Sequence, residues 1–442
     1  MVDKATSVPL AELCDQERGI TYGIVKVGEF VSGGVPVIRG GDIRNGRIEF
    51  DDQKRVSEEV SQQFKRTILK GGEILINLIS EPGHTAIVPS WLSGANVSRD
   101  VAVIPLNNTV DHRYVDYFLK SPMAINWLTS RLQGSVTQKI NLGTLKELPI
   151  PTPPIKEQED IAHILGTLDD KIELNRRMNE TLEAIARAIF KSWFVDFDPV
   201  RAKASGEAPE SICRRLGLTP DLLALFPDRL VDSELGEIPE GWGVLNVAAV
   251  TDNIFSGGTP DTRKPEYWNG ELGWFSSGET RNRFVVGTEK KITAAGVDNS
   301  STKLAVPGDI LIASAGQGNT RGQTSYCAIH TYVNQSVVTV RAKSDAMRPE
   351  WLFYNLSRRY EEMRSISDSH SSRGSLTTKL IGGMPIVYPG PDLVKVFGDF
   401  VGAPISRQVE NQREAEILSG IRDTLLPKLL SGELQVPVAG AA

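Results

Sequence analysis

Two short segments contain residue types that methyl transfer or nucleotide binding would require. Thr152-Pro153-Pro154-Ile155 is close to the Asn/Asp-Pro-Pro-Tyr/Phe motif of amino-methyltransferases. It lacks both the Asn or Asp that holds the target amine and the aromatic ring that stacks on a flipped base. The glycine-rich segment 316–322 lacks the G-x-G-x-x-G spacing, and no P-loop Lys-Ser/Thr follows it. Neither segment predicts catalysis, and we interpret Pro153-Pro154 as the end of a domain.

The histidines and cysteines form no metal-binding or disulfide pattern. The five histidines are scattered, at His84, His112, His163, His330 and His370. Cys14, Cys213 and Cys327 lack metal-ligand spacing, and an odd set of three does not make a disulfide framework. No apolar run reaches the roughly 18 residues needed to span a bilayer, and residues 1–4 do not lead into a signal peptide. We therefore expect a cytoplasmic chain that holds no catalytic residues, metal or cofactor of its own.

The net charge of −6 argues against nucleic-acid binding until it is divided along the chain. Residues 1–150 carry 17 basic and 17 acidic side chains, residues 151–245 carry 11 and 18, and residues 246–442 carry 21 and 20. The acidic excess is confined to the middle. Because local charge governs attraction to phosphate, both flanking parts can still present basic faces. Charge alone leaves DNA binding open, whereas the acidic middle favours contact with protein or water.

The chain repeats itself at a nearly constant offset. Gly72-Glu73-Ile74-Leu75-Ile76 matches Gly308-Asp309-Ile310-Leu311-Ile312, 236 positions later, and Leu148-Pro149-Ile150 matches Met384-Pro385-Ile386 at the same offset. Near the start, Gly33-Gly34-Val35-Pro36 matches Gly257-Gly258-Thr259-Pro260 at an offset of 224, which predicts 12 extra residues around positions 261–272. A unit present twice should fold as two similar bodies related by an approximate two-fold axis. Its ligand should have two unequal halves.

Each copy contains a globular part followed by a long helix. In the first globular part, short strand-like runs such as Ala86-Ile87-Val88 alternate with turn residues, and residues 114–132 are helical in pattern. We predict a mixed α/β (α+β) class. The predicted boundaries are 1–153 for the first globular domain, 154–197 for the first helix, 198–237 for a linker, 238–390 for the second globular domain, 391–432 for the second helix and 433–442 for a tail.

The first long helix has the pattern of a coiled coil. Its apolar positions follow alternating steps of three and four from Ile161 to Trp193, and Asn175 and Asn179 fall on the same seam. At about 1.5 Å per residue, roughly 40 residues extend for about 60 Å. Pro404 predicts a kink or a delayed start in the second helix. Because a two-fold relation inverts one helix against the other, we predict antiparallel pairing, with the globular parts at opposite ends of a rod.

Several segments resemble the specificity subunits of type I restriction–modification systems. They are residues 148–206, which include WFVDFDPV at 193–200, together with EIPEGW at 237–242, SGGTPDTRKPEYWNG at 256–270 and IRDTLLPKLLSGEL at 421–434. The resemblance extends over essentially the whole chain. It departs near the start, where VPLAELCDQERGITYGIVKVGEF stands in place of the Pro-x-Gly-Trp entry motif of that family.

The resemblance implies a DNA-recognition subunit without catalytic activity. Two target-recognition domains would each read one half of a bipartite, asymmetric DNA site, separated by two helices that form an antiparallel coiled coil. The helices would set the spacer and dock two methyltransferase subunits, and two restriction and translocation subunits would join for cleavage. The complex would direct adenine methylation or restriction in phage defence. S-adenosylmethionine, ATP and magnesium would be bound by the partner subunits.

Residues that contact DNA carry no short motif, so we choose candidates by type and place. Glycine in a loop permits close backbone approach, while Arg, Lys, Ser, Thr and Gln reach phosphates or base edges. The candidates are Arg39, Arg44, Arg66, Arg99, Gln138, Lys139, Thr259, Arg263, Arg281, Ser314, Gln317, Arg321, Arg373, Thr378 and Lys379. Lys139 and Lys379 each precede a matching Pro-Ile segment, which predicts cations at equivalent places in the two copies.

Two other functions remain open at this stage. A protein–protein adaptor with a rod-like spacer would form salt-insensitive complexes and leave no sequence-specific footprint, whereas affinity for DNA phosphates falls steeply with salt. A stand-alone methyltransferase would transfer methyl groups as the purified chain. The missing catalytic motifs argue against this second alternative.

Overall fold

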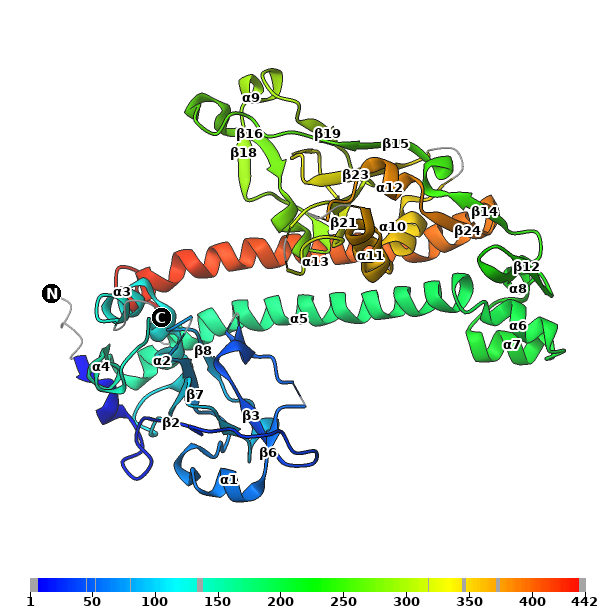
Figure 1. Ribbon diagram of the computed structural model, residues 1–442. Coiled ribbons are helices and arrows are strands. Elements are labelled where there is room, and N and C mark those ends of the chain that lie inside the picture. Colours follow the sequence, from blue (N-terminus) through cyan, green and yellow to red (C-terminus); the bar gives the residue numbers. More distant parts are fainter. Residues whose placement is uncertain are drawn as a thin grey trace, which may run out of the picture. The chain divides into compact units, whose positions relative to one another are not determined.

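The computed structural model describes residues 7–44, 46–51, 53–79, 81–132, 138–316, 318–343, 347–370 and 374–436 (Figure 1). The chain divides into two compact units. Unit 1 contains residues 1–172 and 417–442, and unit 2 contains residues 173–416. Two helices of 40 residues each, α5 (Ile155–Phe194) and α13 (Pro391–Leu430), contribute one segment to each unit. Each unit combines sheets with helices, which confirms the mixed α/β class.

Unit 1 is built on a four-stranded antiparallel sheet in the order β2 (Thr21–Tyr22), β10 (Val101–Ile104), β7 (Ile74–Asn77) and β8 (Thr85–Ile87). Every residue of β7 and β10 is buried, and all but Asn77 are aliphatic. Such residues are suited to strands inside a sheet. A second sheet has the order β6 (Arg55–Val56), β3 (Val35–Ile38) and β9 (Asn96–Val97), in which β3 and β9 are parallel. Smaller ladders join β1 (Ser7–Pro9) to β11 (Pro149–Pro151) and β4 (Ile43–Arg44) to β5 (Arg47–Ile48).

The short helices of unit 1 are α1 (Glu58–Gln62), α2 (His112–Lys120), α3 (Pro122–Thr129) and α4 (Leu142–Glu147). Two of them replace the single helix that the pattern predicts over residues 114–132. The hydroxyl of Ser121 caps α3 and Pro122 occupies its first turn, so the chain restarts there as a new helix.

The segments of α5 and α13 within unit 1 are antiparallel. Ile161 and Leu165 share one apolar core with Leu426 and Leu429. Further along α5, Asp169 pairs with Arg422 at 2.7 Å. Residue numbers rise along one helix as they fall along the other, so this part of the predicted pairing is confirmed.

Unit 2 contains a five-stranded sheet in the order β15 (Thr251–Ser256), β23 (Val337–Ala342), β20 (Ile310–Ala313), β21 (Thr324–Cys327) and β17 (Phe284–Val285). A four-stranded sheet has the order β18 (Lys290–Ile292), β16 (Trp268–Phe275), β22 (Thr331–Val333) and β19 (Lys303–Ala305), with β16 and β22 parallel. Smaller ladders join β14 (Gly243–Asn246) to β24 (Pro385–Tyr388) and β12 (Leu230–Ser233) to β13 (Gly236–Pro239). The helices α9 (Ala294–Asp298), α10 (Pro349–Ser357), α11 (Tyr360–His370) and α12 (Thr378–Gly382) complete the globular part.

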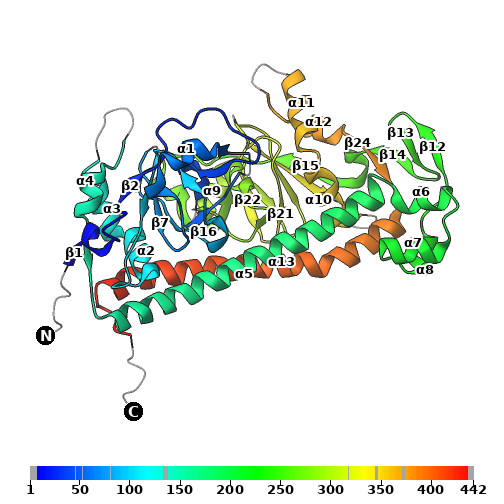
Figure 2. The same cartoon turned by 90° about the horizontal axis from the view of Figure 1, so that it is seen from below.

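Buried amides mark the helix pair within unit 2, where α5 and α13 run side by side (Figure 2). Nδ2 of Asn175 donates to Oε2 of Glu414 at 2.7 Å, Nδ2 of Asn179 donates to the carbonyl of Gln408 at 3.0 Å, and Nδ2 of Asn411 donates to Oδ1 of Asn179 at 2.8 Å. The side-chain nitrogens at the predicted polar seam positions therefore donate across the pair, whereas Oδ1 of Asn175 is buried without a hydrogen-bond partner. Helix α13 begins at Pro391, so the expected delayed start at Pro404 is wrong.

The segment predicted as a linker is largely helical. It contains α6 (Asp198–Ala204), α7 (Pro209–Leu216) and α8 (Pro220–Ala224) before the β12–β13 ladder. Phe197 turns the chain out of α5 with a left-handed φ of 57°. The centroid of its ring lies 5.6 Å from that of Trp242, and the ring centroids of Trp193 and Phe226 are also 5.6 Å apart. Trp193 and Phe197 thus pack the end of α5 against the rest of unit 2.

The internal repeat appears in the structure as the same pairing of strands in both units. Ile76 pairs with Ala102 in unit 1, and Ile312 pairs with Val338 in unit 2, so both partners shift by 236 positions. The predicted slip near the start is wrong. A Cβ on Gly23 would lie 1.8 Å from the carbonyl oxygen of Val97, and a Cβ on Gly257 would lie 1.8 Å from that of Val333. Gly257 therefore matches Gly23, 234 positions earlier. The two glycines are equivalent because each packs against a carbonyl of a neighbouring strand, which the local Gly-Gly pattern does not reveal.

Candidate nucleic-acid interface

In unit 1, two parallel strands end at the same edge and each leads into an arginine. Arg39 follows β3, and Arg99 follows β9 after one intervening residue. The N–H of Gly40 donates to Oδ2 of Asp100 at 2.8 Å, which holds the two segments together. We term residues 39–42 and 98–100 the strand-end site of unit 1.

A buried carboxylate fixes the turn of this site. Asp42 is 5% exposed, accepts the N–H of Arg39 at 2.8 Å and accepts Nζ of Lys54 at 2.7 Å. Gly40 is confined, because a Cβ there would lie 2.5 Å from Oδ1 of Asn77. The backbone is therefore set by internal contacts before any ligand binds.

Three guanidinium groups project from this part of unit 1. Arg39, Arg44 and Arg99 are exposed, and none of their guanidinium groups has a hydrogen-bond or ion-pair partner among the residues that the structure describes. A guanidinium can bind a phosphate, or it can donate two parallel hydrogen bonds to O6 and N7 of guanine. Free cations on a rigid backbone are the arrangement that DNA contact requires.

Unit 2 repeats this construction with other side chains. Ser276 follows β16, and Gln335 follows the parallel strand β22 after one intervening residue. Glu279 is 3% exposed and accepts the N–H of Ser276 at 2.8 Å. Gln335 is exposed, and its Oε1 accepts a hydrogen bond from the hydroxyl of Thr259. We term residues 276–279 and 334–336 the strand-end site of unit 2, in which a hydroxyl and an amide replace the two arginines.

Three further candidates already have partners. Nε of Arg66 donates to the carbonyl of Arg18 at 2.8 Å, and Arg281 pairs with Glu289. Arg263 pairs with Asp261 at 2.9 Å. Hydrogen bonds from the Arg263 side chain, and then from its N–H, lower the pKa of Asp261 to about 2. Each of these cations is engaged at the surface of its own unit.

Two candidates are buried, which corrects the expectation that they are available to DNA. Ser314 is 4% exposed and Arg321 is 8% exposed. Arg321 donates to the carbonyl of Gly374 at 2.8 Å and pairs with Asp368. Its guanidinium therefore stabilises unit 2 internally. Gln317 and Arg373 lie outside the described residues.

Lys139 and Lys379 are exposed but do not occupy equivalent places. The N–H of Ile140 donates to the carbonyl of residue 78 at 2.9 Å, and the N–H of Leu376 donates to that of residue 314 at 2.8 Å. Ile140 therefore matches Leu376, whereas Lys379 lies further on, in α12. The predicted equivalence is wrong, and the offset of 236 likewise pairs Lys139 with Ser375. Gln138 is exposed beside Lys139, and Thr378 is the half-buried first residue of α12.

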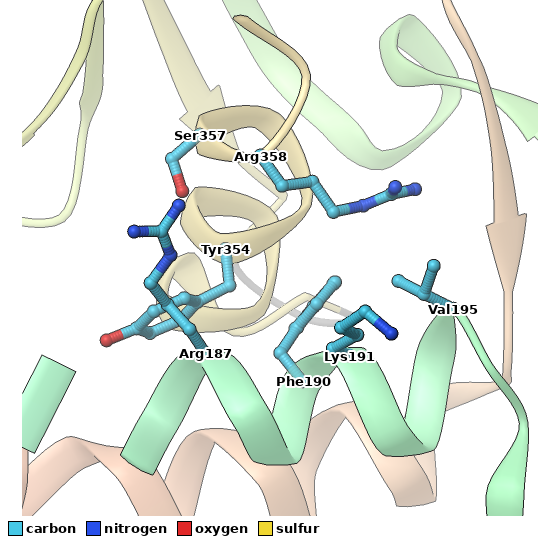
Figure 3. Close-up of a pocket in the computed structure, with 7 residues that line it drawn as sticks. All are labelled: Arg187, Phe190, Lys191, Val195, Tyr354, Ser357 and Arg358. Carbon is cyan, nitrogen blue, oxygen red and sulfur yellow. The ribbon is translucent and has the colours of Figure 1, made fainter. Parts of the chain in front are cut away.

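Unit 2 also contains a cavity of about 230 Å³ between α5 and α10 (Figure 3). Its lining residues are Arg187, Phe190, Lys191, Val195, Tyr354, Ser357 and Arg358. Phe190 and Tyr354 are buried and apolar, whereas Lys191 pairs with Asp196 at the exposed side. Arg187, Ser357 and Arg358 also line it, so the cavity combines aromatic rings with hydrogen-bond donors.

The described residues show no alternative chemistry. No group of three or more His, Cys, Asp and Glu among them is placed to hold a metal ion. Burial raises the pKa of the Cys14 and Cys327 thiols to about 12, so neither supplies a thiolate near neutral pH. None of the described helices is both long and apolar enough to cross a membrane.

Known proteins are similar to this chain in sequence and in fold. The model of the type I restriction modification DNA specificity domain matches residues 7–184. The chain is 26% identical over 440 residues to the type I restriction enzyme HindI specificity subunit of Haemophilus influenzae, covering 90% of this chain and 94% of that one. It is 25% identical over 414 residues to the MjaIX specificity subunit of Methanocaldococcus jannaschii, covering 93% and 89%. A type I restriction–modification S subunit from M. genitalium has the same fold, with a TM-score of 0.59 at 16% identity over 96% of this chain and 95% of that one.

Proposed function

Because the chain belongs to the specificity subunits of type I restriction–modification systems, we propose that its two strand-end sites each read one half of a bipartite, asymmetric DNA site. The chain is the DNA-recognition component of its complex and not the enzyme. One observation carries the proposal. The same backbone construction recurs at the ends of equivalent parallel strands in both units, with different side chains in each. A repeated frame with unequal contacts suits a site with two unequal halves.

We propose that the paired helices set the distance between the half-sites. Half-sites read from one side of B-DNA lie about one turn, or roughly 34 Å, apart. A helix of 40 residues spans about 60 Å, which is ample for that separation. The amides of Asn175, Asn179 and Asn411 favour a single register, because another register would leave them without these partners in the seam.

The subunit works in association with DNA and the other subunits of the system. We propose that two methyltransferase subunits dock on the helices and that two restriction and translocation subunits join for cleavage. Leu174 and Ile185, 53% and 50% exposed, lie about three turns apart on α5. These two exposed apolar side chains on one side of α5 are compatible with contact with another protein. S-adenosylmethionine, ATP and magnesium would bind to the partners, which perform methylation or restriction.

The test is coexpression with the cognate methyltransferase subunit, followed by methylome sequencing of the host DNA. We expect methyladenine confined to one split motif. A complex that assembles and binds S-adenosylmethionine, yet methylates no specific sequence, would favour the adaptor function instead. Salt separates the two functions independently, because DNA affinity should fall steeply as salt rises and an adaptor contact should not.

A further inference from the structure

Arg99 and Gln335 occupy equivalent positions in the two strand-end sites. In unit 1, the N–H of Ser98 donates to the carbonyl of Ile38 at 2.9 Å. In unit 2, the N–H of Asn334 donates to the carbonyl of Phe275 at 3.1 Å. The next residues along the chain are Arg99 and Gln335, and both are exposed. The same backbone therefore presents a guanidinium in one unit and an amide in the other.

Arg44 and Arg281 provide the contrast. Each lies two residues after the buried carboxylate that fixes its turn, Asp42 or Glu279, and each is exposed. An arginine is thus kept in both units at this position, and in unit 2 it is paired with Glu289. Phosphates are the same in every half-site, whereas bases differ. An arginine that is present in both units is therefore suited to contact a phosphate. A position whose side chain differs between the two units is suited to contact a base.

The two changed side chains suit different bases. A guanidinium donates two parallel hydrogen bonds to O6 and N7 of guanine, while a glutamine amide accepts from N6 and donates to N7 of adenine. Oε1 of Gln335 accepts the hydroxyl of Thr259, which orients the amide. The second lone pair of Oε1 and both protons of Nε2 remain for a base.

We propose that Arg99 reads a guanine in the half-site of unit 1 and that Gln335 reads a paired adenine in the half-site of unit 2. This inference rests on the proposed function and adds the base class to each site. Thr259 is a positioning residue in it, acting through Gln335.

The experiment compares methylomes of hosts that express the methyltransferase subunit with the wild-type chain, with Arg99→Gln or with Gln335→Arg. Arg99→Gln should relax one guanine, or replace it with adenine, in one half of the motif only. Gln335→Arg should change an adenine in the other half only. In the matched control Arg44→Gln, the motif should stay unchanged while the slope of log affinity against log salt decreases by about 1.

Binding by the purified complexes gives a second readout if a variant fails to methylate. The wild-type complex should prefer guanine over adenine at the Arg99 position by about 10- to 100-fold, and Arg99→Gln should abolish that preference. An Arg99→Gln complex that retains the original motif, or the original guanine preference, overturns the inference. The proposed function survives that result, because it depends on the wild-type complex methylating a split motif.

Discussion

Gly40 and Gly41 are neighbours in the turn of the unit 1 strand-end site, but their surroundings differ. A Cβ on Gly40 would lie 2.5 Å from Oδ1 of Asn77 and 2.9 Å from Oδ2 of Asp100, whereas a Cβ on Gly41 would meet nothing within 4 Å. The side chains that hold the turn therefore require a glycine at the first position only. Single residues of this kind decide whether Arg39 and Arg99 are presented in a fixed geometry.

Gly40→Ala should lower the free energy of unfolding by about 1–3 kcal/mol, because the crowded turn must open to admit a methyl group. It should also weaken binding to DNA through the half-site of unit 1. Gly41→Ala is the matched control and should change stability by no more than about 0.5 kcal/mol. Urea denaturation and a mobility-shift assay measure the two effects, and equal results for both variants would contradict the packing argument.

The cysteines allow a test of burial. With pKa values of about 12, Cys14 and Cys327 should react with iodoacetamide at pH 8 only through rare thiolates, about one in 10,000. Their reactivity should rise about tenfold with each pH unit until the pH approaches the pKa. Cys213 is half-buried, so native labelling should favour that residue. Mass spectrometry of tryptic peptides measures the labelling, and denatured protein, in which all three should react, is the control.

At the scale of elements, one tyrosine in each unit joins the globular part to α5. The hydroxyl of Tyr117 in α2 donates to Oδ2 of Asp169 at 2.6 Å within unit 1. The hydroxyl of Tyr354 in α10 donates to Oε2 of Glu183 at 2.9 Å within unit 2, and Glu183 also pairs with Arg283 at 2.6 Å. Both acidic partners lie on α5. The acidic residues of the middle of the chain thus have structural roles that overall charge does not reveal.

The amide network of the helix pair predicts a measurable loss. Asn411→Ala should lower the free energy of unfolding by about 1–3 kcal/mol, because Oδ1 of Asn179 loses its donor in a largely buried seam. Asn126 in α3 is exposed and is a suitable control, since Asn126→Ala should cost nothing or stabilise slightly. Thermal unfolding of both variants measures the difference. Unchanged stability of Asn411→Ala would show that water replaces the missing amide.

At the scale of the whole molecule, two linked sites should bind one DNA molecule far more tightly than either site alone. Linkage makes the second contact intramolecular and raises affinity by about 10²–10⁴-fold when the geometry matches. The measurement is competition between an intact split motif and probes with either half scrambled. A motif whose spacer is lengthened by five base pairs should bind like a single half, because the second half then faces the other side of the helix. Undiminished binding to that probe would contradict a fixed spacer.

The apolar periodicity of residues 161–193 predicts the first long helix, and the internal repeat predicts its antiparallel pairing with the second. Apolar steps of three and four, with Asn175 on the seam, give one solution for burying a long helix, and the structure buries Asn175 to 1% exposure. The repeat at an offset of 236 likewise predicted two similar bodies, because an apolar run such as Ile310-Leu311-Ile312 becomes the centre of a sheet in either copy. Apolar periodicity and apolar runs depend on residues that are close in the sequence, so they can be recognised without a tertiary structure.

The tertiary structure alone decided which polar residues are available and which positions are equivalent. Arg321 and Arg99 look alike in the sequence, but one is buried against Asp368 and the other is free and exposed. Gln335 was missed although the constant offset of 236 already pairs it with Arg99, because no short motif marks either residue as a contact to DNA. Sequence patterns fix what each segment tends to form, because apolar burial follows local periodicity. The partners of a polar side chain come from segments far along the chain, so only the folded structure determines them.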